Sequence, residues 1–467
     1  MAQVPAISTV YGGCVGSQGN DHGLAIAYDA PGTIFYGGQF QGTADLNPGA
    51  GTALTVSSGS SDGFISRLDQ TGAYQWSGKL GGNSSERVNS VATDAAGNLY
   101  VTGSFGGTAD FNPAGGLSDN ATSAGGLDIF VAKYSPAGVY QWVKRAGGST
   151  NDEGIDIKVS ADGTVYVVGY YNETSDFDPG SGTYNLPGTG LFQNVFVWKL
   201  RSDGSFAGAA AVAGPSNDIG NALAMRGSEV VVVGQFWGSV DFDPGAGTNT
   251  LTSAGNFDAF VLYLDTLDLS FNAAMRAGGS ANDNYTAVSA DALGHVWITG
   301  FFLGTADLDP TAGTDNHTSA GMTDILYTRL RADGSFGFTK TFGGTGEDEG
   351  RDILGHPNGK GYAVGKFSNT VDWDPGTGTL SNTSLGSTDM FVLALDSTGA
   401  YTGHNCFGSP YPDHGQALTM NSVARSPSQA SPQRQHGFRR RLSPYCQQQW
   451  QRGRICPHRH PLCLHPT

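Results

Sequence analysis

Residues 94–113 read DAAGNLYVTGSFGGTADFNP, and this stretch decides the fold. It starts with a turn rich in Ala, Gly and Asn, continues with an alternating apolar run over residues 99–105, and ends on Asp110-Phe111-Asn112-Pro113. β-Branched and aromatic residues at a period of two, bounded by Gly and Pro turns, are typical of a β-strand. The stretch therefore predicts a short strand that leads into a polar loop.

The tetrapeptide that closes this stretch recurs along the chain as Asp, an apolar residue, Asn or Asp, and Pro. Its six copies are spaced by 65, 66, 65, 66 and 65 residues. They occupy residues 45–48, 110–113, 176–179, 241–244, 307–310 and 372–375. A second acidic marker keeps the same period at Asp21, Glu86, Asp152, Asp218, Asp283, Asp348 and Asp413. Two independent markers with one period identify a tandem repeat.

Each repeat contains four short strand signals. In the second copy they lie at residues 88–94, 99–105, 129–134 and 139–144. They are joined by an Ala-Gly-Asn turn, a long loop rich in Gly, Thr and Asp, and a Ser-Pro-Ala-Gly turn. Four strands per repeat is the pattern of a β-propeller blade. The sequence thus predicts an all-β protein in which residues 1–421 form a propeller with six full repeats.

The two ends of this region predict how the ring closes. Residues 8–11 match the fourth, outermost strand of a blade, and the first inner strand follows at residues 24–28. An N-terminal strand that completes the last blade is a common way to remove an open sheet edge. The last blade begins at residues 413–418, and its pattern stops after Ser422. We therefore expect seven blades with the last one incomplete; the alternative is a six-bladed ring in which residues 8–11 pair beside residues 401–407 or replace them.

Residues 422–467 differ from the repeats. They hold eight Arg and no Asp or Glu, and they are rich in Pro, Gln and His. This composition is typical of a disordered tail. A frameshift near Val423 is a second interpretation, since a one-base shift lets synonymous codons for residues 440–457 spell the repeat pattern. A last blade without its middle strands would leave an open edge, through which we expect self-association.

Charge and hydropathy exclude some classes of partner. Residues 1–413 carry 17 Lys and Arg against 41 Asp and Glu, a net charge of −24. Such a surface disfavours nucleic acids and anionic membranes and favours cations or cationic surfaces. The sequence contains no run of 18 apolar residues, so it does not predict a helical membrane span. The opening MAQVPAISTV does not have the pattern of a signal peptide.

The repeat resembles the bacterial β-propeller repeats known as SBBP repeats. The resemblance lies in Gly81-Gly82, the acidic turn that follows, residues 94–103 and the DIFVAK stretch at residues 128–133. It implies a seven-bladed propeller that is secreted or exposed on a bacterial surface. It brings no catalytic residues to this chain.

The repeated acids predict cation sites. The strand directions place the loop before the first strand and the loop between the second and third strands on one rim, so both acidic markers lie there. Carboxylate oxygens are preferred ligands of Ca²⁺. The candidate calcium ligands are Asp110, Asp176, Asp178, Asp241, Asp243, Asp307, Asp309, Asp372, Asp374, Asp152, Asp218, Asp283 and Asp348. The alternative is that these side chains fix turns ahead of a rigid Pro, which their identical use in every blade favours.

The same repetition bears on function. Catalysis needs a few specific residues, whereas these loops carry nearly the same acids in each blade. The sequence therefore predicts a non-enzymatic, extracellular or cell-surface module for adhesion, matrix or scaffolding, with a protein or glycan ligand on its acidic face. The alternative is an enzyme that cleaves glycans or esters at the mouth of the central channel, where propellers often bind ligands.

Overall fold

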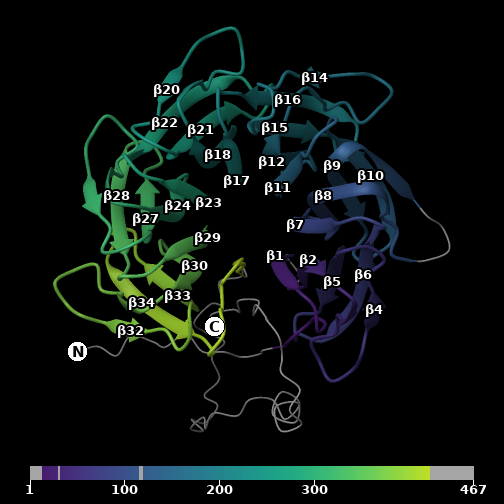
Figure 1. Cartoon of the computed structure of the whole chain (residues 1–467), viewed down its shortest axis with the longest axis horizontal. Helices are drawn as coiled ribbons and strands as arrows, with labels where there is room; N and C mark the ends of the chain where they lie inside the picture. The colour runs from purple at the N-terminus through teal and green to yellow at the C-terminus, as the bar shows by residue number, and fades with distance from the viewer. Residues whose placement is uncertain (1–12, 30–31, 115–118, 421–467) are drawn as a thin grey trace.

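A computed structural model describes residues 13–29, 32–114 and 119–420. Every regular element in these residues is a strand, and the strands form six four-stranded antiparallel blades around a central channel (Figure 1). None of the described residues forms a helix that could cross a membrane. The β-propeller fold predicted from the repeats is confirmed.

The strands of each blade follow one another from the channel outward (Figure 1). The first strands are β1 (His22–Tyr28), β7 (Glu86–Thr93), β11 (Glu153–Val159), β17 (Ile219–Arg226), β23 (Asn284–Ala290) and β29 (Glu349–Gly355). The second strands are β2 (Ile34–Phe40), β8 (Leu99–Asp110), β12 (Val165–Tyr171), β18 (Glu229–Phe236), β24 (Val296–Phe302) and β30 (Gly361–Phe367). The third strands are β5 (Asp62–Leu68), β9 (Asn120–Tyr134), β15 (Asn194–Leu200), β21 (Asp258–Asp265), β27 (Asp324–Leu330) and β33 (Asp389–Leu395). The fourth strands are β6 (Tyr74–Gly82), β10 (Tyr140–Ala146), β16 (Phe206–Val212), β22 (Phe271–Gly279), β28 (Phe336–Phe342) and β34 (Tyr401–Phe407).

The long loop between the second and third strands is itself partly folded. In five blades it contains a small hairpin, and in blade 2 the same hairpin is continuous with β8 and β9. The hairpins are β3 (Thr43–Asp45) with β4 (Leu54–Val56), β13 (Ser175–Asp176) with β14 (Asn185–Leu186), β19 (Ser239–Asp241) with β20 (Thr250–Thr252), β25 (Thr305–Asp307) with β26 (Asn316–Thr318), and β31 (Thr370–Asp372) with β32 (Ser381–Thr383). The repeated Asp therefore ends the first strand of each hairpin.

Hydrophobic cores lie between neighbouring blades. Ile129 and Val131 of β9, for example, pack with Ile157 and Val167 of blade 3, and all four side chains are fully buried. Burial of apolar surface is worth roughly 25 cal/mol per Å², so these cores join the blades into one ring. The recurring aromatic residues of the fourth strands pack against these cores, and they are Trp76, Trp142, Phe206, Phe271, Phe338 and Tyr401.

A seventh position in the ring is marked on its inner side by residues 413–420 (Figure 1). The N–H of Asp413 donates to the carbonyl of Thr388 at 2.9 Å, as Asp348 does to Thr323 at 2.8 Å. Leu418 then packs on the core of blade 6. The prediction of a regular strand at residues 413–418 is wrong, because these residues follow the course of a first strand without pairing in a ladder.

The outer side of the seventh position is marked by residues 13–17. Gly16 and Asp45 exchange two backbone hydrogen bonds of 2.9 Å, and Gly147 and Asp176 make the same bridge between blades 2 and 3. Val15 packs on the core of blade 1. The start of the chain thus takes the place of the end of a fourth strand, in agreement with seven positions. Residues 8–11 and 422–467, on which the other closure predictions fall, lie outside the described residues.

Candidate functional site

The first Asp of each repeated tetrapeptide fixes the turn of its own hairpin. Asp176 Oδ1 accepts hydrogen bonds from the N–H of Asp178 at 3.0 Å and of Tyr184 at 2.9 Å. The next residue, Phe177, is fully buried and anchors the turn in the core. The same oxygen accepts the same kind of pair of backbone bonds at Asp45, Asp110, Asp241, Asp307 and Asp372.

The second acid or amide of the tetrapeptide makes the next turn. Asp178 Oδ1 accepts from the N–H of Gly180 at 2.8 Å, across the Pro that fixes the backbone between them. The corresponding bonds are made by Asn47, Asn112, Asp243, Asp309 and Asp374. Asn serves as well as Asp here because the bond needs one acceptor oxygen and no charge.

The second acidic marker lies in the junction between two blades. Asp152 Oδ2 accepts from the N–H of Gly148, after the last strand of blade 2, at 2.7 Å, and Oδ1 accepts from the N–H of Asn172, after the second strand of blade 3, at 2.8 Å. Asp218, Asp283 and Asp348 are likewise fully buried. Burial raises the pKa of Asp152 and of Asp218 to about 7 and that of Asp283 and of Asp348 to about 6. A carboxylate without water favours its neutral form, so these groups titrate near neutral pH.

A third set of acids lies on the third strands, and it was not predicted from the sequence. Asp128 accepts from the N–H of Ala124 at 3.0 Å and pairs with Arg145 of β10 at 2.6 Å. Lys79 and Arg276 pair with Asp62 and Asp258 in blades 1 and 4. The signal was present in blades 1, 2 and 4 as an Asp at the third strand with a basic residue 17 or 18 positions later. An Asp before an apolar run is also typical of a turn, so the pattern was not distinctive.

Two buried carboxyl groups meet at a glycine in this junction. A Cβ on Gly147 would lie 2.8 Å from Asp128 Cγ and 2.9 Å from Asp152 Oδ2, and its φ of 146° also favours glycine. Burial raises the pKa of Asp128 as well. The arrangement at Gly147 can therefore hold a proton at neutral pH, since two adjacent carboxylates repel each other.

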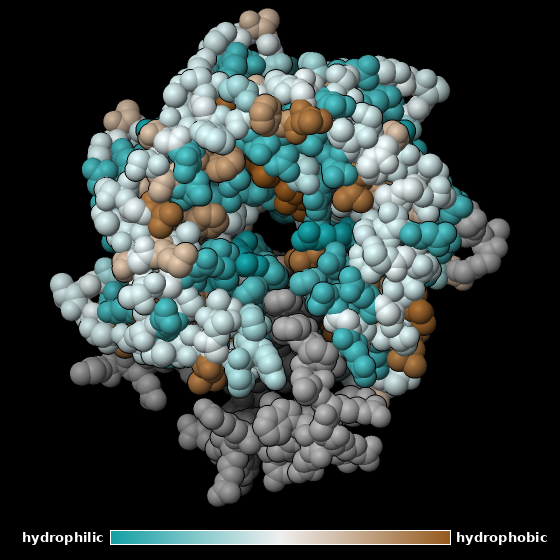
Figure 2. Space-filling model, viewed as in Figure 1, coloured by the Kyte–Doolittle hydropathy of each residue, from teal (hydrophilic) through white to brown (hydrophobic). Residues whose placement is uncertain are grey.

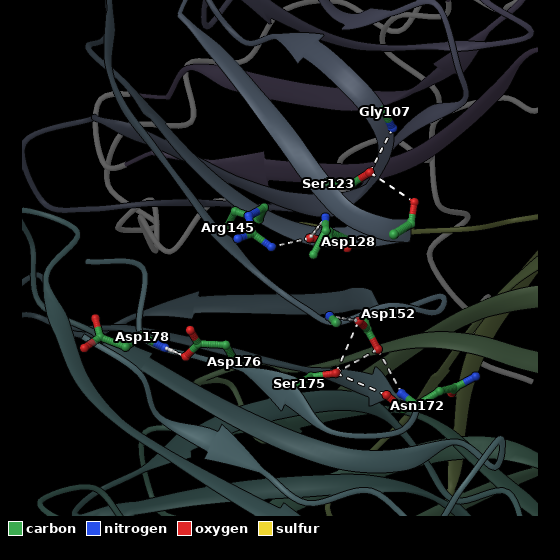
Figure 3. Close-up of polar contacts among 12 residues, drawn as sticks. Gly107, Ser123, Asp128, Arg145, Asp152, Asn172, Ser175, Asp176 and Asp178 are labelled. Atoms are coloured by element: carbon green, nitrogen blue, oxygen red, sulfur yellow. Dashed lines mark hydrogen bonds and ion pairs between the residues drawn. The ribbon is translucent and has the colours of Figure 1, made fainter. Parts of the chain in front are cut away.

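The candidate calcium ligands lie in two separate groups (Figure 3). Asp176 and Asp178 hold turns in the hairpin, whereas Asp152 is bonded to Asn172 and Ser175 at the junction. Within the described ranges, no three Asp, Glu, His or Cys side chains gather as a metal site would require. Calcium binding by the repeated acids stays a prediction, and their observed contacts are those of turn formation.

The channel is lined by seven inner segments, namely the six first strands and residues 416–419, around a cavity of about 540 Å³. On the face drawn in Figure 2, hydrophilic residues gather around the opening. Several of the lining residues reach the next blade. Asn89 Nδ2 donates to the carbonyl of Gly154 at 2.8 Å, and Thr286 Oγ1 to that of Gly350 at 2.7 Å. These polar groups stabilise the ring.

Charged side chains enter the channel wall from two blades. Lys158 Nζ pairs with Asp156 at 2.7 Å, and Asp156 Oδ2 also accepts from the N–H of Leu223 in the next blade at 3.0 Å. Asp352 makes the equivalent bond to the N–H of Leu418 at 2.6 Å, and burial raises its pKa to about 7. The two aspartates thus clamp the neighbouring inner segments. Unlike the rim acids, this group of charges is not repeated in every blade.

Comparison with known proteins gives partial similarities. No family model matches the chain, so the SBBP resemblance stays a prediction. An uncharacterized WD repeat-containing protein of Acanthamoeba polyphaga mimivirus is 37% identical over 118 residues, which cover 23% of this chain and 8% of that protein. The regulatory protein FlaEY of Caulobacter vibrioides is 25% identical over 370 residues, which cover 75% of this chain and 37% of that protein. The chain therefore spans well under half the length of both relatives.

Solved structures with similar architecture include quinohemoprotein alcohol dehydrogenase from Comamonas testosteroni, at 8% identity and a TM-score of 0.39, covering 85% of this chain and 68% of that one. Sqt1 from Chaetomium thermophilum has 12% identity and a TM-score of 0.30, covering 84% of this chain and 86% of that one. The assignment of this chain as a β-propeller rests on its own sheets, cores and channel.

Proposed function

We propose that the chain is a non-enzymatic extracellular β-propeller that serves as a binding or scaffold module on a surface or in a matrix. One observation carries the proposal. In all six blades, one oxygen of the first Asp of the tetrapeptide accepts two backbone N–H groups, as at Asp176 and Asp372. Loops held in this way form a rigid rim. A rigid rim favours recognition, because little conformational entropy is lost when a partner binds.

Charge supports a cationic or neutral partner. The net charge of −24 in residues 1–413 attracts basic protein segments and repels nucleic acids. Protein and glycan ligands on the acidic face are both consistent with this charge. Self-association through the edge of the last blade is a further part of the proposal, and sedimentation at rising protein concentration tests it.

The test of the proposed class is a turnover assay. We expect no turnover when the purified chain is incubated with panels of glycans, esters and lactones. Reproducible turnover that a substitution in the channel removes would contradict the proposal. The extracellular location is tested separately, by protease treatment of intact source cells followed by detection with an antibody against the propeller; a chain that is degraded only after lysis would contradict it.

An enzyme with its site at the channel mouth is the second candidate. The observation that favours it is the unrepeated group of Asp156, Lys158 and Asp352 in the channel wall. A buried carboxyl group that titrates near neutral pH is suited to general acid or base catalysis. Turnover in the panel that is lost in Lys158→Ala, while the variant keeps the melting temperature of the wild type, would establish this candidate in place of the first.

A further inference from the structure

Five of the six junctions at the rim share one close contact. The residue three positions before the acid of the third strand is a glycine, and it lies against the backbone of the connection to the next blade. A Cβ on Gly125 would lie 2.2 Å from the carbonyl oxygen of Ser149, and one on Gly255 would lie 2.2 Å from that of Ser280. Gly59, Gly321 and Gly386 make the same approach. Any side chain at this position would push the loop off the connection.

The junction between blades 3 and 4 breaks this rule. Leu191 stands at the glycine position and is 74% exposed, and Phe192 beside it is 45% exposed. In blade 3 the third-strand acid is replaced by Asn194, which is buried. Ala211 takes the position that Arg145 holds in blade 2, so the Asp–Arg ion pair of blade 2 is absent at this junction. The end of the loop is still held, since the N–H of Gln193 donates to Asn217 Oδ1 at 3.0 Å.

An aromatic pair lies on the other side of the same connection. The N–H of Trp237 donates to Asp218 Oδ1 at 3.1 Å, so the backbone of Trp237 contacts the buried marker acid of this junction. Its side chain is 43% exposed, and its ring centroid lies 5.7 Å from that of Phe257. The equivalent positions in the other blades hold Gln41, Gly106, Asn172, Leu303 and Ser368. The fold therefore has no need of a tryptophan here.

The surroundings of these exposed side chains are acidic. The loops at residues 172–193, 214–218 and 237–257 contain no Lys or Arg. They contain five partly exposed acids, namely Glu173, Asp176, Asp178, Asp241 and Asp243. These exposed aromatic and aliphatic side chains lie on both sides of one connection, in a field of one sign. Such a surface complements a partner of the opposite sign.

We propose that Leu191, Phe192 and Trp237, together called the 3–4 rim patch, form the docking site for a protein segment that carries an apolar anchor residue flanked by Lys or Arg. The inference rests on the proposed binding function and names its partner. Large exposed apolar side chains rimmed by polar residues mark interaction sites on monomeric proteins. Trp is also among the residues that contribute most when such sites bind.

The test uses a fluorescein-labelled synthetic peptide with one Leu anchor between Lys and Arg residues. One counterpart has Glu in place of the basic residues, and another has Ser in place of the anchor. Titrations with the full chain at physiological ionic strength are expected to show binding of the first peptide alone, weakened by added salt. Trp237→Ala or Leu191→Gly should weaken binding at least about tenfold, which corresponds to about 1.4 kcal/mol.

The matched control is Leu385→Ala, since Leu385 is 72% exposed on the rim of blade 6, where the glycine contact is kept. This variant should bind the peptide as the wild type does, and all three variants should keep the wild-type melting temperature. No binding of the basic peptide, or an equal loss in the Leu385 variant, would overturn the proposal. Binding of an oligosaccharide array that is lost in Trp237→Ala would overturn it in favour of a glycan. None of these outcomes depends on the turnover panel that tests the proposed function.

Discussion

The junction between blades 2 and 3 and the junction between blades 3 and 4 occupy equivalent places in the ring, yet they are built differently. The first has two buried carboxyl groups, Asp128 and Asp152, with Arg145 on one of them and a tight glycine contact at Gly125. The second keeps one buried acid, Asp218, and replaces the tight contact with an exposed Leu191. At both junctions Oδ1 of the marker acid accepts the backbone N–H of the residue that follows the second strand of the next blade.

The difference shows which parts of the repeat the fold requires. The marker acid is kept at both junctions and accepts a backbone N–H of the next blade at each, so this bond is part of the blade contact. The glycine contact is absent at the junction between blades 3 and 4, and among the six described blades the third-strand acid has an Arg or Lys partner in blades 1, 2 and 4. Junctions without these features still close, so both features are local solutions. Some residues differ from the repeat at positions where the fold does not require a particular side chain. We expect a function specific to this chain to depend on such residues.

The largest effect is expected from exchanging the glycine position between the two junctions. Gly125→Leu places a Cβ 2.2 Å from the backbone of Ser149, so the backbone must shift, and we expect a loss of about 2–4 kcal/mol in the free energy of unfolding. Leu191→Gly removes an exposed side chain and should cost less than about 1 kcal/mol. Chemical denaturation of the two variants checks this difference, and equal losses would contradict it.

A smaller effect is expected from giving the second junction the charges of the first. Asn194→Asp buries a second carboxyl group near Asp218 without a cation, and we expect a loss of about 1–3 kcal/mol at pH 8. Adding Ala211→Arg supplies the missing cation at the position that Arg145 holds, so the double variant should recover much of the loss. Denaturation of the single and double variants at pH 8 measures the coupling; an undiminished loss in the double variant would show that the junctions are not equivalent.

The pH dependence of stability reports the marker acids as a group. The folded-state pKa values of Glu86, Asp152 and Asp218 are raised to about 7 by burial, so the folded chain binds more protons than the unfolded chain between about pH 4 and 7. Stability should therefore fall as the pH rises through this window. Below about pH 4 the turn acids with lowered pKa values, such as Asp94 and Asp291, reverse the trend. A melting temperature that is lower at pH 5 than at pH 8 would contradict the raised values.

Sequence reasoning recovered the blades well because their signals are local. The strands predicted at residues 99–105 and 129–134 lie within β8 and β9, and the turn that Asp110 makes follows from its place before Asn and Pro. The acids of the third strands were missed because Asp128 gains its role from Arg145, which lies on another strand. The 3–4 rim patch was missed because the exposure of Leu191 depends on how its loop meets the next blade, which no local pattern encodes.

The most direct test of the account is thermal unfolding of the full chain with Ca²⁺ and with EDTA. A ligand that binds the folded state alone raises its stability by mass action. Since the carboxylates of the rim already accept backbone N–H groups, as at Asp176 and Asp178, the account predicts the same melting temperature in both conditions. A Ca²⁺-dependent rise that is lost in Asp178→Asn would contradict it and would make the repeated acids metal ligands.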